Sequence, residues 1–140
     1  MRTSPFHKLI LLAILLVPFL LVGNADSPPT VTVNITNSLP SNEALKLHCR
    51  SKEHDYGVKV LENEKSYALK FDPSSVKTTT VSCDFVWDEI IHGYPMYDSR
   101  RDTCKQCNWI VRHREAYEGI VPCMQKDNTA AEPHCFYWEI

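Results

Sequence analysis

Alternation of apolar and polar residues constrains the fold of this chain more than any other feature. It runs through four stretches, which are residues 30–36, 45–50, 67–71 and 81–88. In the last of them, one face carries Val81, Cys83, Phe85 and Trp87. Because successive side chains of a strand point to opposite faces, a period of two predicts β-strands with one buried face. We therefore expect Phe85 and Trp87 to lie in the core.

The segments between and after these stretches complete the fold prediction. Two less regular strand candidates are 92–97 and 107–112, and Pro95 places the first at a sheet edge or a bulge. Turn-forming residues separate the candidates, at 39–42, 53–57, 62–64 and 72–75. No segment has the sustained apolar stripe of a helix, and residues after Glu118 show no clear periodicity. The sequence predicts an all-β protein, a small antiparallel β-sandwich with an Ig-like arrangement of two sheets.

The first 25 residues predict export from the cell. Arg2 and Lys8 precede an unbroken apolar run, residues 9–22, and Gly23 and Ala25 form a small-x-small cleavage pattern. The run has 14 residues, whereas a membrane-spanning helix needs about 17–25. We interpret residues 1–25 as a signal peptide and residues 26–140 as a single secreted, extracellular domain without stable membrane insertion. An uncleaved membrane anchor is the alternative.

The composition of residues 26–140 excludes some classes of partner. Without Arg2 and Lys8, 13 Lys and Arg residues stand against 17 Asp and Glu residues, which gives a net charge of −4. This balance lacks the basic footprint of a nucleic-acid-binding protein, so no nucleic acid is expected as a partner. An even number of cysteines in a secreted chain implies a disulfide framework. Its members are Cys49, Cys83, Cys104, Cys107, Cys123 and Cys135.

The Cys104-x-x-Cys107 spacing also occurs in redox proteins, where a helix start lowers the pKa of one thiol. Here the pair precedes a predicted strand. Because residues i and i+3 of a strand face opposite ways, we predict structural disulfides in which each sulfur bonds elsewhere. A zinc site with Cys49, His48 or His134 is disfavoured, since there is no second Cys-x-x-Cys motif. No metal and no cofactor are expected.

No set of catalytic residues is evident. Asp84 and Asp88 are predicted on the outward face of their strand, whereas glycoside hydrolysis needs carboxylates on a shared cleft. The histidines are scattered, and the chain has no Gly-x-Ser-x-Gly elbow. We predict that the protein is not an enzyme, and a small secreted hydrolase is a disfavoured alternative.

Three polar features are candidate sites on the surface. Asn34-Ile35-Thr36 is a glycosylation sequon, and Asn34 is predicted on the polar face of the first strand, where a glycan would not disturb the core. Two further segments, 52–55 and 98–102, are predicted as exposed loops, and arginine is enriched at interfaces because its planar fork pairs with carboxylates. The candidate receptor contacts are Lys52, Glu53, His54, Asp55, Asp98, Arg100, Arg101 and Asp102. A merely solvated loop is the alternative in both cases.

An ordered set of short motifs covers about residues 31–117. The motifs are Val33-x-Ile35-x-Asn37, Leu47-x-Cys49-x-Ser51, His54-Asp55-x-Gly57, Tyr67-x-x-x-Phe71, Thr79-Thr80, Cys83-x-Phe85-x-Trp87, Tyr97, Asp102 and Cys104-x-x-Cys107-x-Trp109-x-Val111. In this order and spacing, behind a signal peptide, the chain resembles the plant self-incompatibility S-protein family, the S-protein homologues. It departs from the family at Glu115-Ala116-Tyr117, where a Gly-x-Tyr-like step is frequent, and in having two additional cysteines in the tail.

This resemblance implies a small secreted β-sandwich without catalytic residues. The founding members act as stigma-secreted determinants that inhibit self pollen through a receptor on the pollen surface. The expected function is therefore that of a non-catalytic extracellular ligand in plant cell–cell recognition, with a cell-surface protein receptor on another cell as its partner. A secreted defence protein, either a toxin or an inhibitor of a foreign enzyme, is the alternative. Because Cys123 and Cys135 are extra to the four cysteines of the family, we predict that they form a bridge with each other.

Overall fold

Strands dominate the part of the chain that the computed structural model describes, residues 30–74 and 76–139. The predicted signal peptide lies outside this part. The elements are β1 (Val31–Ser38), η1 (Pro40–Asn42), β2 (Leu45–Arg50), β3 (Asp55–Leu61), β4 (Ser66–Phe71), β5 (Thr80–Trp87), β6 (Ile90–Asp98), β7 (Gln106–Arg114), η2 (Glu115–Tyr117), β8 (Gly119–Lys126) and β9 (His134–Cys135). Among the described residues, no helix is long and apolar enough to cross a membrane.

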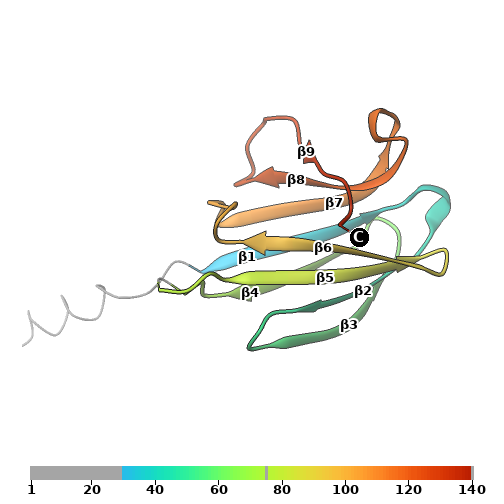
Figure 1. The fold of residues 1–140 in the computed structure, drawn as a ribbon. Helices are drawn as coiled ribbons and strands as arrows, with labels where there is room; N and C mark the ends of the chain where they lie inside the picture. Colours follow the sequence, from blue (N-terminus) through green and yellow to red (C-terminus); the bar gives the residue numbers. More distant parts are fainter. Residues whose placement is uncertain (1–29, 75, 140) are drawn as a thin grey trace, which may run out of the picture.

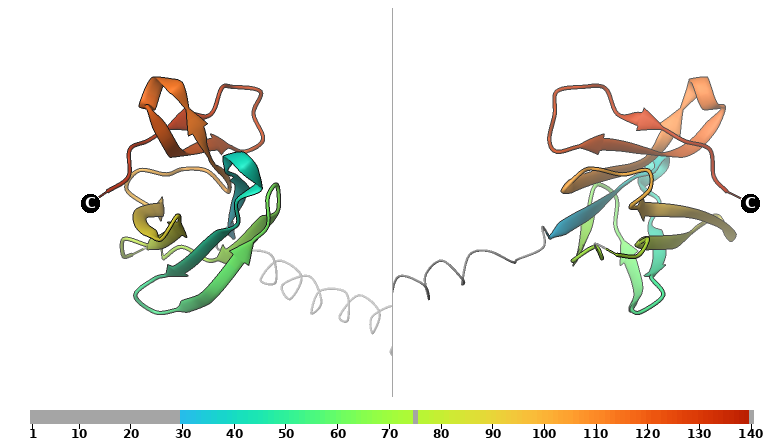
Figure 2. Two further views of the ribbon diagram at one scale, coloured as in Figure 1. Left: turned by 90° about the vertical axis from the view of Figure 1, so that its right-hand side faces the viewer. Right: turned by 60° about the vertical axis from the view of Figure 1, so that its left-hand side comes forward.

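The strands form two sheets that pack face to face (Figures 1 and 2). One sheet has five strands in the order β4-β1-β7-β8-β9, and the other has four in the order β3-β2-β5-β6. This arrangement confirms the predicted β-sandwich. All neighbouring strands are antiparallel except β1 and β7, which run parallel. The predicted antiparallel arrangement therefore holds for every neighbouring pair except this one. Alternation fixes which face of a strand is buried but not which neighbour it takes.

All six predicted strand segments are strands in the structure, and three further strands were missed. In β3, Val58, Lys59 and Val60 are all exposed, so this edge strand has no continuous buried face to produce alternation. In β8, the four consecutive residues 121–124 are all buried, because the strand is covered on both faces. The third, β9, has only two residues and pairs with β8 through Cys123 and Cys135.

The core lies between the sheets and centres on fully buried Trp109 of β7. Its indole Nε1 donates a hydrogen bond of 2.8 Å to the backbone carbonyl of Met96 in β6, which joins the two sheets. Phe85 is fully buried, as expected. Trp87 is only half-buried, which corrects the expectation for this residue: it lies at the end of β5 and stacks on His92 with ring centroids 3.8 Å apart.

Three disulfides join the six cysteines. They are Cys49–Cys83 between β2 and β5, Cys104–Cys107 at the start of β7, and Cys123–Cys135 between β8 and β9. The expected Cys123–Cys135 bridge is thus present in the structure. The expectation that Cys104 and Cys107 bond elsewhere was wrong: β7 begins at Gln106, so Cys104 belongs to the preceding loop and strand alternation does not separate the two sulfurs.

Candidate functional site

Four connections between strands meet at one end of the sandwich, the left-hand end in Figure 1. They are β2–β3 (51–54), β4–β5 (72–74 and 76–79), β6–β7 (99–105) and β8–β9 (127–133). Loops on a rigid scaffold are where recognition residues concentrate, since they vary without disturbing the core. We call this end of the molecule the loop end.

A cleft of about 830 Å³ opens at the loop end. The β2–β3 connection contributes Lys52, Glu53 and His54 to it, and the β6–β7 connection contributes Arg100. The structure therefore brings the two predicted contact segments to one surface, although nearly fifty residues separate them in the chain. The other residues lining this loop-end cleft are Arg50, Ser51, Tyr56, Phe71, Asp72, Ser74, Lys77, Thr78, Thr79, Thr80, Val81 and Ser82.

Hydrogen bonds hold the loops around the cleft in place. Thr79 donates its backbone N–H to Ser99 Oγ at 2.9 Å, and Ser99 donates its N–H to the Thr79 carbonyl at 3.0 Å. The β2–β3 connection is closed by the Ser51 N–H, which donates to the carbonyl of His54 at 2.8 Å. The lining side chains are thus carried by loops whose backbones are tied to each other or closed on themselves.

Asp55 is the fourth residue of the first predicted contact segment, and it begins β3 instead of lying in the loop. Its Oδ1 accepts the Gly57 N–H at 2.8 Å and lies 2.6 Å from Nε2 of His48. The pKa of this carboxyl lies below its ordinary value, because two hydrogen bonds stabilise the charged form. The bond from the Gly57 N–H is the larger cause and the bond with His48 is the second. Asp55 is exposed but does not line the cleft.

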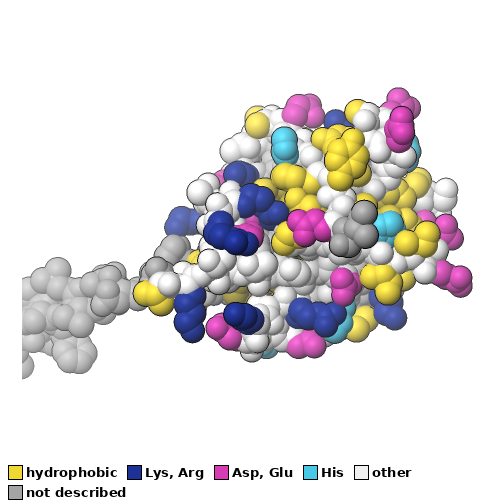
Figure 3. Space-filling view, in the orientation of Figure 1, with side chains coloured by type: hydrophobic (Ala, Val, Ile, Leu, Met, Phe, Trp, Pro, Cys, Tyr) yellow, Lys and Arg dark blue, Asp and Glu magenta, His cyan; other side chains and the backbone are white. Residues whose placement is uncertain are grey.

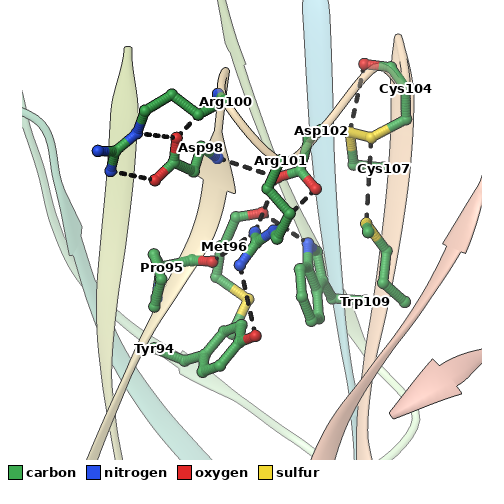
Figure 4. A network of polar contacts seen from close by, with 11 residues as sticks. Tyr94, Pro95, Met96, Asp98, Arg100, Arg101, Asp102, Cys104, Cys107 and Trp109 are labelled. Carbon is green, nitrogen blue, oxygen red and sulfur yellow. Dashed lines mark hydrogen bonds and ion pairs between the residues drawn. A yellow bond between two sulfur atoms is a disulfide. The ribbon is translucent and has the colours of Figure 1, made fainter. Parts of the chain in front are cut away.

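The second predicted contact segment forms two ion pairs, Arg101 with Asp102 and Arg100 with Asp98 (Figure 4). Asp102 is buried, and it binds Arg101 through two bonds: Nη2 to Oδ2 at 2.7 Å and Nε to Oδ1 at 2.9 Å. Arg101 also donates to the carbonyl of Pro95 at 2.7 Å, and its guanidinium lies 5.4 Å from the ring centre of Tyr94. The sequence predicted both residues in an exposed loop, and this was wrong. They lie between β6 and β7, where the ion pair satisfies the charge of each side chain.

In the second ion pair, Arg100 is exposed and Asp98 is largely buried. Arg100 Nη2 donates to Asp98 Oδ2 at 2.8 Å, and both Nε and the backbone N–H of Arg100 donate to Asp98 Oδ1. The Asp98 N–H in turn donates to the buried Asp102 Oδ2 at 2.9 Å. Arg101 and Asp102 therefore position Asp98, and Asp98 positions Arg100 at the rim of the cleft.

The hydrogen bonds from Arg100 lower the pKa of Asp98 from its ordinary 3.8 to about 2. A lowered pKa in the folded state stabilises the protein above about pH 4, and this stabilisation is lost as the pH falls through 2. We expect the melting temperature of the native protein to exceed that of Asp98→Asn at pH 6, and the difference to shrink between pH 4 and pH 2. Thermal melts of both proteins over this range test it, and a difference that stays constant would contradict the assignment.

Asn34, the predicted glycosylation site, lies in the middle of β1 between β4 and β7. Its neighbours Val33 and Ile35 are fully buried, so Asn34 points to the outer face of the five-stranded sheet and is half-exposed. The residues that line the cleft do not include any from β1 or β7. A glycan on Asn34 would therefore leave the loop-end cleft open.

The described residues offer little that could support metal or acid–base chemistry. Among them, no group of three or more His, Cys, Asp or Glu side chains is placed to hold a metal ion. Asp84 is bound by Arg50 at 2.9 Å on the outer face of its sheet. Several cleft residues were not predicted from the sequence, chiefly Tyr56, Phe71 and Lys77. The run Lys77-Thr78-Thr79-Thr80 was a usable signal, because it places a cation and three hydroxyls directly before a strand.

Comparison with known proteins identifies the family. The family described as "Plant self-incompatibility protein S1" matches residues 32–138. "S-protein homolog 5" of Arabidopsis thaliana is 34% identical over 100 residues, 67% of this chain and 78% of the relative, and "S-protein homolog 3" of the same plant is 34% identical over 112 residues, 76% and 71%. "Self-incompatibility protein S1" of Papaver rhoeas is 28% identical over 103 residues, 70% and 74%. No solved structure matches the chain. The chain therefore belongs to the plant self-incompatibility protein S1 family.

Proposed function

We propose that this protein is a secreted, non-catalytic ligand that binds a protein receptor on the surface of another plant cell. The observation that carries the proposal is the convergence of the two predicted contact segments on one cleft, with Lys52, Glu53 and His54 from one loop and Arg100 from another. Family membership and the relative named self-incompatibility protein S1 support recognition between pollen and pistil as the setting. Cleavage after Ala25 and a glycan on Asn34 are parts of the same proposal.

The loop end suits receptor recognition for a physical reason. A ligand that binds through loops gains affinity when those loops are already in the bound arrangement, since less conformational freedom is lost on binding. Here Arg100 is held by Asp98, and the adjoining Ser99 is bonded to Thr79 of the neighbouring loop. In this arrangement Arg101 and Asp102 are positioning residues, and Arg100, Lys52 and His54 are the contacts offered to the receptor.

The test is binding of the fluorescently labelled mature protein, residues 26–140, to pollen and to leaf protoplasts. We expect saturable binding to one cell type that is lost after trypsin treatment of the cells. The variant His54→Ala with Arg100→Ala removes one side chain from each loop and should weaken binding about tenfold, which corresponds to about 1.4 kcal/mol.

The control is Lys65→Ala with His113→Ala, which likewise removes one exposed cation and one exposed histidine, at the opposite end of the sandwich. It should bind like the native protein. Binding that survives trypsin would contradict a protein receptor. Absence of binding to any cell, together with inhibition of a foreign enzyme, would establish the defence alternative instead.

A further inference from the structure

We propose that the loop-end cleft binds an extended acidic segment of the partner protein. Carboxylates of that segment would contact Lys52 and Lys77, and its backbone would lie along the start of β5 at Thr80. This inference rests on the proposed receptor-binding function and names the chemistry that the receptor must present. Charge, backbone pairing and the character of the cleft floor support it independently.

The charge of the cleft is opposite in sign to that of the protein. Residues 26–140 carry a net charge of −4, yet the lining contains four cations, Arg50, Lys52, Lys77 and Arg100, against only Glu53 and Asp72. Arg50 and Arg100 are held by carboxylates outside the cleft lining, Asp84 and Asp98. Lys52 and Lys77 are exposed and form no ion pair with any residue of the described chain. They are therefore available to a partner's carboxylates.

Acidic residues collect at the opposite end of the sandwich. The four connections there carry seven carboxylates and one lysine, namely Glu43, Glu62, Glu64, Lys65, Asp88, Glu89, Glu115 and Glu118. On the face shown in Figure 3, most Lys and Arg side chains lie toward the left, loop end, and several Asp and Glu side chains lie at the right-hand end. Such a separation of charge orients an approaching acidic partner toward the cleft, because the far end repels it.

The strand pairing leaves room for an extended chain. Strand β5 lies between β6 and β2. Its pairing with β6 begins at Thr80, whereas its pairing with β2 begins only at Ser82, which lies opposite Arg50, the last residue of β2. The side of Thr80 that faces away from β6 is therefore beyond the last residue of β2. Half-buried Thr80 lines the cleft, whereas Val81 is fully buried. An extended peptide can form hydrogen bonds with the backbone of a strand where no neighbouring strand lies beside it. Such pairing contributes affinity that does not depend on the side chains of the peptide.

The floor of the cleft suits a peptide better than a compact anion. Tyr56 of β3 and Phe71 of β4 are half-buried aromatic residues, and Phe71 packs edge-on against Tyr97 with ring centroids 5.0 Å apart. The Tyr56 hydroxyl can serve as a donor, and burial raises its pKa further above the ordinary value. A surface that has aromatic rings next to hydroxyls and cations can bind both the side chains and the carboxylates of one peptide segment.

The experiment measures the Kd of fluorescein-labelled decaglutamate for the purified mature protein by fluorescence anisotropy. We expect binding that weakens with added salt. Lys52→Glu with Lys77→Glu should raise the Kd about tenfold or more, because reversal adds repulsion as well as removing attraction. In ¹⁵N spectra of the native protein, the peptide should shift the amide signal of Thr80.

The matched control, Lys65→Glu with Lys70→Glu, makes the same change in net charge at exposed lysines outside the cleft. It should change the Kd less than about threefold. Equal weakening by both variants would show diffuse attraction and overturn the site. Tighter binding of an oligogalacturonate of equal charge would overturn the peptide assignment in favour of an acidic polysaccharide.

The outcome for the site is separable from that for the proposed function. If decaglutamate does not bind and does not compete with binding to cells, whereas the native protein still binds cells, the acidic segment is wrong and receptor binding stands. If decaglutamate binds at the cleft but no cell type binds the protein, the site stands and the proposed function is wrong.

Discussion

Trp109→Ala is expected to lower the free energy of unfolding by about 3–5 kcal/mol, because it removes the largest fully buried side chain and leaves a cavity between the sheets. The indole contacts Tyr94 and Phe136 at ring-centre distances of 5.6 and 5.7 Å, so the cavity would be lined from several elements. A domain of this size has only about 5–15 kcal/mol of stability in total. Urea unfolding of the oxidised protein measures the loss.

Trp109→Phe is the matched control for the hydrogen bond. It keeps an aromatic ring in the core but leaves the Met96 carbonyl without its indole donor, which costs about 1–3 kcal/mol. The alanine variant should therefore be the less stable of the two. If both variants had the same urea midpoint of unfolding as the native protein, Trp109 would not be the centre of the core.

Asp102→Ala is expected to destabilise the protein by about 3–5 kcal/mol, because it leaves the charge of Arg101 unpaired in a largely buried position. The Arg101 side chain is only 28% exposed and that of Asp102 is fully buried. The same change removes the acceptor for the Asp98 N–H, so the loop that carries Arg100 loses one of its anchors. The effect is therefore predicted on both stability and cell binding.

Two further variants separate the contributions to this effect. Arg101→Met with Asp102→Leu replaces the pair by apolar side chains and should recover much of the stability lost in Asp102→Ala, since the unpaired charge causes most of the cost. Arg100→Ala should lower the urea midpoint much less than Asp102→Ala does, because the Arg100 side chain is 73% exposed and solvent screens its ion pair with Asp98. An equal loss for Arg100→Ala, or none for Asp102→Ala, would contradict this difference between the two ion pairs.

The site was only partly predictable from the sequence. Residues 52–54 and Arg100 were identified by polarity and turn composition, because a solvent-exposed loop has no core to constrain its residues. The same reasoning placed Arg101 and Asp102 in solvent and was wrong. Composition does not reveal that a neighbouring Asp and Arg satisfy each other, and only packing against Tyr94 and Trp109 allows the pair to be buried.

The sequence by itself determined the fold class and the faces of most strands. Val31, Val33 and Ile35, and likewise Val81 and Phe85, are buried on the face that alternation assigned to the core. This information is local, because the side-chain direction of a strand residue follows from its position alone.

The tertiary structure alone decided which segments are neighbours. It placed β7 beside β1 in parallel, covered β8 on both faces, and joined Cys104 to Cys107. It also brought the loop at Lys52 to the loop at Arg100 and so created the cleft. Such contacts depend on burying surface between residues distant in the chain, and no pattern within one strand or loop encodes them.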